Sequence, residues 1–344
     1  MSLPGNEMLR EISEIPEVLK SLSNQIAEDS KAKSLFEEHN FKSVVILARG
    51  TSDNAAHFLK YLIELKMGLP VALASPSIAT MYEARLQYQG TLLVAISQSG
   101  QSLDLVSFAN AAKAGGAYVL SITNDSKSPL AELSDHHIFI GAGLELAVPA
   151  TKSYAGQIMA AYLLTLHWSK NPVETDEIIK GAKHFVDDKT NYQTFARELD
   201  LKRPIYVLGR GFSYPNAKEF ALKLQETCLV PVQGMSSSDF MHGPIASLNE
   251  TSQVIFMSPE HLPVDSFGEV PRKVRAITGK LFWIGSGKLA EAGDIVLSGL
   301  ASSSEITASI SDIVAFQKVT HYLATSKGLD PDSPRGLNKV TITR

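Results

Sequence analysis

The amino-acid sequence predicts an α/β fold in which one open parallel sheet, flanked by helices, occurs twice along the chain. Two observations lead to this prediction. Short apolar runs alternate with helical segments, which is the pattern of parallel sheets covered on both faces. Residues 44–64 also align within residues 204–226 at an offset of 161 positions, and the same offset places Ser97 on Ser258, each closing an apolar run. We therefore infer an internal duplication of one α/β unit.

The first half begins with Ser43–Ala48, a predicted strand that ends in Arg-Gly-Thr-Ser. Its valines and isoleucine favour a strand because β-branched side chains pack well on a pleated surface. The other predicted strands are Val71–Ala74, Thr91–Ser97, Ala117–Ile122 and His137–Gly141. The predicted helices are Asn54–Leu65, Leu103–Ala114 and the largely apolar Lys152–His167.

The second half repeats this order. The apolar run at 204–209 precedes a helix at Asn216–Cys228, and later strands are predicted at 254–258, 280–284 and 294–298. One long helix over Ile306–Ser326 would match Lys152–His167. We expect an N-terminal helical segment at 1–25, a first domain at 26–171, a helical linker at 172–200, a second domain at 201–328 and a tail at 329–344.

The composition limits the class of protein. The chain has 344 residues, of which 44% are hydrophobic and 20% charged, with a net charge of −4. This apolar content is enough to form a full core, and the chain has no excess of basic residues that would favour binding to nucleic acid. No apolar run approaches the ~18–20 residues of a membrane helix, and the charged start lacks the apolar region of a secretory signal. We expect a cytoplasmic protein with neither a membrane nor a nucleic-acid partner.

The only cysteine, Cys228, excludes an internal disulfide and zinc sites built on several thiolates. It falls in a predicted helix, so we interpret it as a small buried hydrophobe. No HExxH pair, Walker A loop or GxGxxG fingerprint follows a predicted strand. We therefore expect no metal and no organic cofactor.

Ligands of open parallel sheets bind outside the carboxyl ends of the strands, which here carry serine-rich loops. Ser97-Gln98-Ser99-Gly100-Gln101-Ser102 leaves a strand and enters a helix, so its hydroxyls and backbone N–H groups suit a phosphate. An ordinary loop with a serine N-cap is the alternative. Gly50-Thr51-Ser52 has the same placement and the same two interpretations. Pro149–Ser153, before the long helix, is a weaker candidate.

Three further residues carry chemistry only if the fold brings them to a site. Glu226 follows Lys223 by three positions on one predicted helix, which fits either a surface ion pair or a proton-transfer site. His242 precedes Gly-Pro, which indicates a rigid turn rather than a core helix. Lys339, in the tail, is by itself an ordinary solvated lysine.

Taken together and in order, these motifs resemble a known family. RGTS, SQSGQS, AVPATKS, GRG, EFALKLQE, MHGPIA and PRGLNK resemble the tandem SIS (sugar isomerase) domains of the glucosamine–fructose-6-phosphate aminotransferases. The resemblance covers nearly the whole chain. It implies two flavodoxin-like domains related by duplication, in agreement with the repeat.

The resemblance also implies roles for residues. Glu226 would move a proton between C1 and C2 of the sugar, with Lys223 as a second site lysine. His242 would open the sugar ring from a neighbouring subunit, so a homodimer is expected. Lys339 would form a Schiff base with the ketose. The implied substrate contacts are Gly50, Thr51, Ser52, Ser97, Gln98, Ser99, Ser102, Val148, Thr151 and Asn338.

The sequence departs from the family pattern in three places. Ser102 stands where the family commonly has Thr, Pro149-Ala150 replaces a small pair, and Arg335-Gly336-Leu337-Asn338-Lys339 replaces Arg-Asn-Leu-Ala-Lys. The family's glutaminase domain has an N-terminal cysteine nucleophile, whereas no cysteine follows Met1 here and about 25 residues precede the first α/β half. We therefore expect ammonia release rather than ammonia capture from glutamine.

These features predict a glucosamine-6-phosphate deaminase, which converts glucosamine 6-phosphate and water to fructose 6-phosphate and ammonia. The alternatives on the same site are a galactosamine-6-phosphate deaminase, another aldose–ketose isomerase and a deglycase for fructosyl-amino-acid phosphates. An alternative of another class is a non-catalytic sugar-phosphate sensor.

Overall fold

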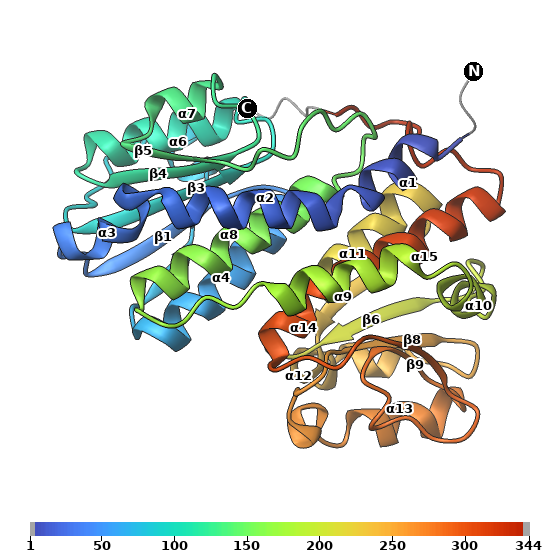
Figure 1. Ribbon diagram of the computed structural model, residues 1–344. Helices are drawn as coiled ribbons and strands as arrows, with labels where there is room; N and C mark the ends of the chain where they lie inside the picture. Colours follow the sequence, from blue (N-terminus) through green and yellow to red (C-terminus); the bar gives the residue numbers. More distant parts are fainter. Residues whose placement is uncertain (1–3, 340–344) are drawn as a thin grey trace. The chain divides into compact units, whose positions relative to one another are not determined.

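The computed structural model describes residues 4–339, which divide into two compact units with one sheet each (Figure 1). Unit 1 comprises residues 4–16, 146–151 and 175–337. Unit 2 comprises residues 17–145, 152–174 and 338–339. The chain passes between the units several times, so these divisions differ from the contiguous domain ranges expected from the sequence.

Unit 2 contains a parallel sheet with the strand order β2-β1-β3-β4-β5. The strands are β1 (Ser43–Leu47), β2 (Val71–Leu73), β3 (Thr91–Ser97), β4 (Tyr118–Thr123) and β5 (His136–Phe139). Every residue of the central strand β3 is buried, as expected for a strand covered on both faces. The order is that of flavodoxin-like folds, so this prediction is confirmed.

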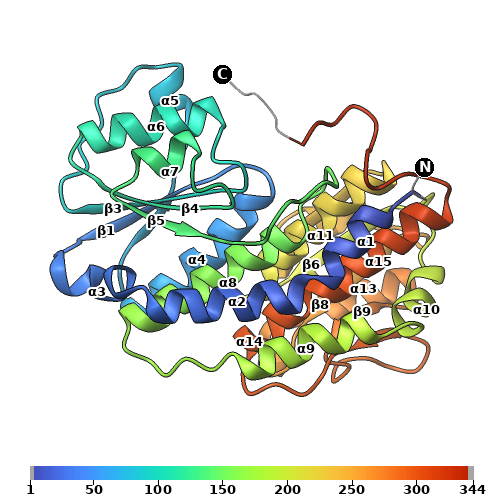
Figure 2. The ribbon, with the colours of Figure 1, turned by 45° about the horizontal axis from the view of Figure 1, so that its top comes forward.

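Helices cover both faces of this sheet, with α4 and α8 on one side and α6 and α7 on the other (Figure 2). The helices are α2 (Ile15–Glu28), α3 (Ser30–Glu38), α4 (Thr51–Met67), α5 (Ser77–Thr80), α6 (Leu103–Ala114), α7 (Pro129–Leu133) and α8 (Lys152–Trp168). Leu105 and Phe108 of α6 pack against Val45, Leu93 and Val119 of the sheet. Helix α8 is buried around almost its whole circumference, which explains its largely apolar sequence.

Unit 1 contains a second parallel sheet with the order β10-β9-β8-β6-β7. Its strands are β6 (Ile205–Gly209), β7 (Val232–Ser236), β8 (Gln253–Ser258), β9 (Phe282–Gly285) and β10 (Ile295–Ser298). Counted in chain order, the five strands are arranged as in unit 2, which confirms the duplication. The aligned glycines Gly50 and Gly211 also share a left-handed backbone, with φ of 55° and 56°.

The helices of unit 1 pack on both faces of its sheet, with α11 and α15 opposite α13 (Figure 1). They are α1 (Asn6–Ser13), α9 (Asp176–Asp187), α10 (Asn191–Arg197), α11 (Ser213–Cys228), α12 (Ser237–Met241), α13 (Val270–Thr278), α14 (Glu305–Ser311) and α15 (Ile313–Ser326), with 3-10 turns η1 (Pro244–Ser247) and η2 (Val264–Phe267). Phe220 of α11 stacks on Phe316 of α15 with ring centroids 5.5 Å apart. On the other face, Phe256 stacks on Trp283 at 4.6 Å.

Strand β3 and helix α6 have the predicted bounds, but two helices begin earlier than predicted. Helix α4 begins at Thr51 and α11 at Ser213, because a left-handed glycine turn starts each helix directly. The prediction of one helix over Ile306–Ser326 is wrong. Helices α14 and α15 are separated at Asp312, where the hydrogen bond from Phe316 N to Asp312 O is stretched to 3.4 Å.

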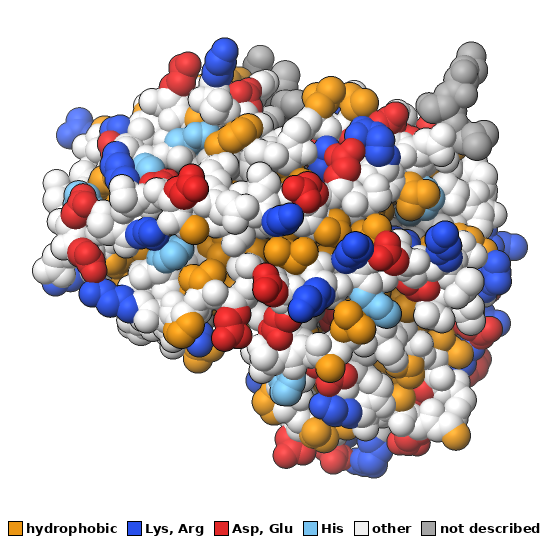
Figure 3. All heavy atoms as spheres, in the orientation of Figure 1, with side chains coloured by type: hydrophobic (Ala, Val, Ile, Leu, Met, Phe, Trp, Pro, Cys, Tyr) orange, Lys and Arg blue, Asp and Glu red, His pale blue; other side chains and the backbone are white. Residues whose placement is uncertain are grey.

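No helix among residues 4–339 is long and apolar enough to cross a membrane. Basic and acidic side chains are interspersed over the face shown in Figure 3, as the mixed-sign composition predicts.

Asp312, the residue between α14 and α15, is a buried acid. Its side chain is 4% exposed, and its Oδ2 atom has no hydrogen-bond partner within the described part of the chain. A Cβ atom at Gly285 would lie 3.0 Å from Oδ2, and one at Gly299 would lie 3.1 Å from Oδ1, so both positions leave room for the carboxyl group. Burial, with a smaller effect from the charge of Glu260, raises the pKa of Asp312 to about 8.

We predict that Asp312→Asn stabilises the protein more at pH 8 than at pH 5. Between the unfolded pKa near 4 and the folded pKa of about 8, the unfolded chain has lost the Asp312 proton while the folded protein keeps it. Stability therefore falls as pH rises through this window, by up to about 1.4 kcal/mol per pH unit, and asparagine removes this loss. Urea unfolding at several pH values measures the difference. A stability difference that does not change with pH would contradict the assignment.

Candidate active site

The loop after β3 in unit 2 is a tight turn closed by its own serines. Ser97 Oγ accepts a hydrogen bond from Gly100 N at 3.1 Å, and Ser99 Oγ accepts one from Gln101 N at 3.3 Å. Gly100 has φ of 62°, and a Cβ atom there would lie 2.2 Å from Ser128 Oγ. Only glycine fits this position, so the backbone of the loop is fixed before any ligand binds.

Ser102 stands at the N-cap position of α6, yet its side chain makes no capping hydrogen bond. The interpretation of this loop as an ordinary serine cap is therefore not supported. The hydroxyl and the first N–H groups of a helix of twelve residues lie together at the carboxyl end of a parallel strand. This arrangement suits a phosphate, because the helix N-terminus favours negative charge.

The neighbouring loop after β1 adds a positive charge to this region. The Arg49 guanidinium, about half exposed, pairs with the buried Asp104 of α6 through an Nε–Oδ2 contact of 3.0 Å. Ser52 is buried and accepts a hydrogen bond from Gln157 Nε2 of α8 at 3.0 Å. The predicted loops at 50–52 and 97–102 are thus tied to each other through α6 and anchored to α8.

The equivalent loops of unit 1 are occupied by the protein's own carboxylates. Glu305 Oε1 accepts a hydrogen bond at 2.9 Å from the backbone N–H of Phe212, the residue aligned with Thr51. Burial raises the pKa of Glu305, and the hydrogen bond from Phe212 partly opposes this. Glu260 stands where unit 2 has Ser99, so a carboxylate paired with Lys288 at 3.0 Å takes the place of a hydroxyl here. Of the two duplicated loops, the one in unit 2 suits an anion.

Helix α11 of unit 1 holds a buried cation between two carboxylates. Lys223 is fully buried, and its Nζ atom lies 2.5 Å from Glu226 Oε2 and 3.3 Å from Glu219 Oε1. Burial lowers the pKa of Lys223, but the two carboxylates outweigh it and hold the pKa above its usual value. The pair is therefore no surface ion pair. Glu226 keeps 21% of its side chain exposed, so it can reach a ligand while Lys223 cannot leave.

His242 lies in the exposed turn between α12 and η1, as the Gly-Pro signal predicted. Its backbone N–H donates to Asp239 O at 3.0 Å, and the following Gly243 has φ of 135°. The imidazole thus stands on a rigid turn at the surface of unit 1.

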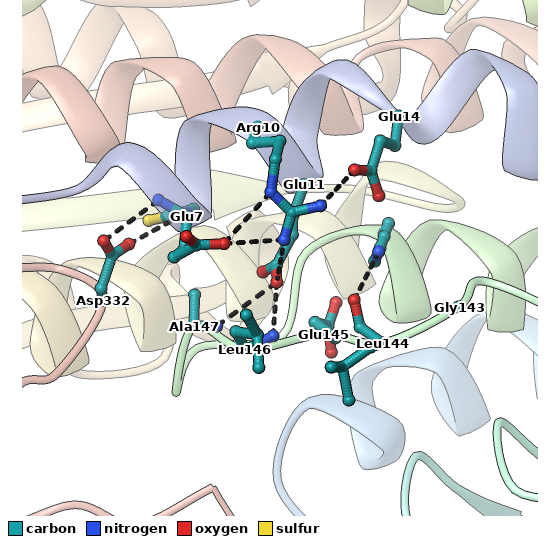
Figure 4. Close-up of polar contacts among 12 residues, drawn as sticks. Glu7, Arg10, Glu11, Glu14, Gly143, Leu144, Glu145, Leu146, Ala147 and Asp332 are labelled. Carbon is teal, nitrogen blue, oxygen red and sulfur yellow. Dashed lines mark hydrogen bonds and ion pairs between the residues drawn. The ribbon is translucent and has the colours of Figure 1, made fainter. Parts of the chain in front are cut away.

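The segment that carries Val148 is held by acidic residues distant in sequence (Figure 4). Glu11 of α1, which is 0% exposed, accepts hydrogen bonds from the backbone N–H groups of Leu146 and Ala147. Val148 N donates to Asp332 O at 2.9 Å. Three successive N–H groups are thus satisfied by side chain or backbone from α1 and the tail, which fixes Val148 in place.

Asp332 also caps α1. Its carboxylate accepts hydrogen bonds from Glu7 N at 3.1 Å and Met8 N at 2.7 Å. The N-cap residue of α1 is Gly5, which has no side chain to accept these hydrogen bonds, so Asp332 satisfies the first N–H groups of the helix instead. Thr151 at the end of the same segment is fully buried, and its carbonyl accepts from Gln317 Nε2 of α15 at 3.1 Å.

The tail lysine is not solvated. Lys339 Nζ lies 2.8 Å from Oε2 of the buried Glu145 in unit 2, whereas the preceding Asn338 is exposed. The predicted phosphate loop and Lys339 therefore belong to unit 2, and Glu226, Lys223, His242, Val148 and Thr151 belong to unit 1.

The sequence reasoning missed five polar residues that hold these groups. Arg49 was within a motif already singled out, and Glu219 lies four positions before Lys223 on one helix face, so both had a local signal. Asp104, Glu145 and Glu11 pair over long sequence separations and had none. Within residues 4–339, no group of three or more His, Cys, Asp or Glu side chains could hold a metal ion.

Comparison with known proteins agrees with this geometry. The model of the SIS domain matches residues 39–167 and 198–263, one stretch in each half of the duplication. The chain belongs to the SIS-domain family. We therefore interpret the chemistry of the candidate site as that of an enzyme of the sugar-isomerase type.

Individual relatives and solved structures are similar to this chain over nearly its whole length. Glutamine–fructose-6-phosphate aminotransferase (isomerizing) of Pyrococcus horikoshii is 30% identical over 351 residues, which cover 97% of this chain and 57% of that protein. The chain thus spans little more than half the length of this relative. A crystal structure from Silicibacter pomeroyi DSS-3, described as a phosphosugar isomerase, is 32% identical with a TM-score of 0.83, covering 95% of this chain and 99% of that one. Glucosamine-6-phosphate deaminase of Thermotoga maritima shares the fold at 20% identity and a TM-score of 0.78, covering 98% and 100%.

We predict that Gly100→Ala destabilises the protein more than Gly68→Ala. Both glycines have a left-handed φ, 62° and 66°, so both substitutions strain the backbone by about 1–2 kcal/mol. Only the Gly100 substitution also drives Cβ into Ser128, which adds about 1–3 kcal/mol of overpacking, whereas nothing lies within 4 Å at Gly68. Urea unfolding of the two variants gives the difference, and equal losses would show that the loop is not fixed by this contact.

Proposed function

We propose that this chain is a glucosamine-6-phosphate deaminase that converts glucosamine 6-phosphate and water to fructose 6-phosphate and ammonia. The observation that carries the proposal is the Glu226 carboxylate, partly exposed and held 2.5 Å from the buried ammonium of Lys223. This carboxylate lies beside a fixed positive charge. It is suited to take a proton from one carbon and return it to the next.

The mechanism uses the groups already described. The sugar phosphate binds with its phosphate in the Ser97–Ser102 loop near Arg49, and His242 assists ring opening. Glu226 removes the C2 proton of the open-chain aldehyde and delivers it to C1, while one proton passes from the amino nitrogen to the C1 oxygen. This converts the amino aldehyde to a C2 imine with a C1 hydroxymethyl group. Water then adds to C2 and ammonia leaves, so atoms and charge balance. The negative charge that develops on the enolamine is favoured by the ammonium of Lys223.

The only cysteine of the sequence takes no part in the proposed chemistry. Making ammonia from glutamine by the nucleophilic route requires a reactive thiolate. Cys228 is 4% exposed, and burial raises its pKa to about 11, so it is inert at neutral pH. Cys228 therefore does not supply such a thiolate.

We predict that the purified chain releases ammonia and ketose in equal amounts from glucosamine 6-phosphate, and that Glu226→Gln lowers kcat by about 10²–10⁴-fold. The Gln variant should keep its affinity for the sugar phosphate, because the phosphate loop is untouched. A panel of hexose and hexosamine 6-phosphates and fructosyl-amino-acid phosphates, with ammonia and ketose measured in parallel, is the test. Glu132→Gln, an exposed position on α7, is the matched control.

Each result of this panel decides between the alternatives. Preference for galactosamine 6-phosphate would change only the C4 epimer. Ketose formation without ammonia would indicate an aldose–ketose isomerase, and turnover of fructosyl-amino-acid phosphates alone would indicate a deglycase. Binding without turnover in the wild-type chain would overturn the enzyme proposal in favour of a sensor.

A homodimer in which His242 completes the neighbouring subunit's site makes a separate prediction. When inactive Glu226→Gln and inactive His242→Ala chains are mixed and allowed to exchange subunits, each mixed dimer regains one intact site, so about a quarter of wild-type activity returns. Turnover after mixing, together with sedimentation of the mixture, measures this. Activity that stays absent despite exchange would place His242 in its own subunit's site.

A further inference from the structure

Glu145 is a buried carboxylate with an unusually complete set of donors. It is 3% exposed, and its Oε1 atom accepts from Ser153 N at 3.1 Å. Its Oε2 atom accepts from Ser153 Oγ at 2.7 Å and from Lys339 Nζ at 2.8 Å. Ser153 lies in the first turn of α8, so the helix N-terminus adds to the stabilisation of the negative charge.

A second lysine lies in the first turn of α8, next to Ser153. Lys152, the first residue of α8, is 2% exposed, and its Nζ atom donates to Leu144 O at 2.8 Å. Lys339 Nζ contacts Glu145 Oε2 directly. Because the carboxylate is buried and the lysine side chain only 23% exposed, the pair is far less screened than a surface ion pair.

We propose that Glu145 is the positioning residue of the tail lysine and serves as its counter-ion both before and after a Schiff base forms with the ketose. This inference rests on the proposed function and adds to that mechanism the role that the family resemblance implies for Lys339, which is condensation with C2 of fructose 6-phosphate. Neither Glu145 nor its pairing with Lys339 follows from any local sequence signal.

The charge balance of the condensation explains why one carboxylate suffices. The ammonium of Lys339 and the C2 carbonyl become a protonated imine and water, so the lysine nitrogen carries one positive charge at the start and at the end. Between these states the nitrogen must be an uncharged amine to attack C2. Glu145 accepts the proton that the ammonium loses and returns it to the hydroxyl that leaves C2 as water. The carboxylate then lies beside the cationic imine.

This role predicts a pH signature for Schiff-base formation. With Glu145 as an internal proton acceptor, the rate at which Lys339 condenses with fructose 6-phosphate should vary little between pH 6 and 8. In Glu145→Gln the proton must go to solvent base, so we expect the rate at pH 6 to fall at least tenfold and to rise with pH. A residue that only supported the fold would change the amount of active protein and not the shape of this profile.

The experiment traps the adduct with borohydride during incubation of the full chain with fructose 6-phosphate, followed by intact and peptide mass spectrometry. Lys339→Ala identifies the modified residue, and Glu132→Gln is the matched control for a glutamate far outside this contact. Ser153→Ala is a second variant that keeps the charge. It removes one donor to Glu145 but leaves the proton acceptor in place, so the trapping rate should stay as insensitive to pH as in the wild-type chain.

The outcomes separate this inference from the proposed function. A Lys339 adduct whose pH profile is unchanged in Glu145→Gln, or changes to the same extent in Ser153→Ala, overturns the inference and leaves the deaminase standing. Ammonia release without any wild-type adduct does the same. Neither ammonia release nor an adduct overturns both. The flat wild-type profile, its loss in Glu145→Gln and its retention in Ser153→Ala together support the inference.

Discussion

The constraint on which the rest of this structure depends is that every strand in each sheet is parallel. Parallel strands all present their carboxyl ends at one edge, so the loops that leave them converge there whatever their distance in sequence. The Gly50–Ser52 and Ser97–Ser102 loops are neighbours for this reason. Their fine geometry is then set by glycine, because only Gly100 tolerates both a left-handed φ and the closeness of Ser128.

Because the α/β unit is duplicated, the protein has two sheets, each with such a carboxyl-end edge, and the two edges differ in charge. In unit 2 the loops carry hydroxyls, helix N-terminal N–H groups and Arg49, all of which favour an anion. In unit 1 the equivalent places hold the carboxylates of Glu305 and Glu260. Unit 1 instead buries Lys223 between two carboxylates on α11, a strongly coupled cluster that would be costly to disrupt. Two copies of one fold have thus acquired different electrostatics through a few substitutions at matching positions.

The sequence predicted the fold well because period, length and repetition are local properties of the chain. It predicted β3 and α6 to the residue and, through the repeat, the duplication of one α/β unit. The prediction of one continuous helix failed at Asp312. The apolar periodicity continues on both sides of this buried acid, so the pattern alone does not indicate that one helix ends and another begins there. In the candidate site the sequence reasoning found the loops, Glu226 and His242, whose signals lie in short motifs. It could not find Glu145, Asp104 or Glu11, because their partners lie far along the chain and only the folded structure brings them together.

The central claim is that Glu226 moves a proton between C1 and C2 of a hexose phosphate. Its most direct test is solvent exchange, with fructose 6-phosphate incubated with the chain in D₂O and examined by proton and deuterium NMR. The account predicts deuterium at C1 with the wild-type chain and at least a hundredfold slower incorporation with Glu226→Gln. It also predicts no incorporation into fructose, which lacks the phosphate. Absence of exchange at C1 of fructose 6-phosphate and at C2 of glucosamine 6-phosphate with the folded wild-type chain would contradict it.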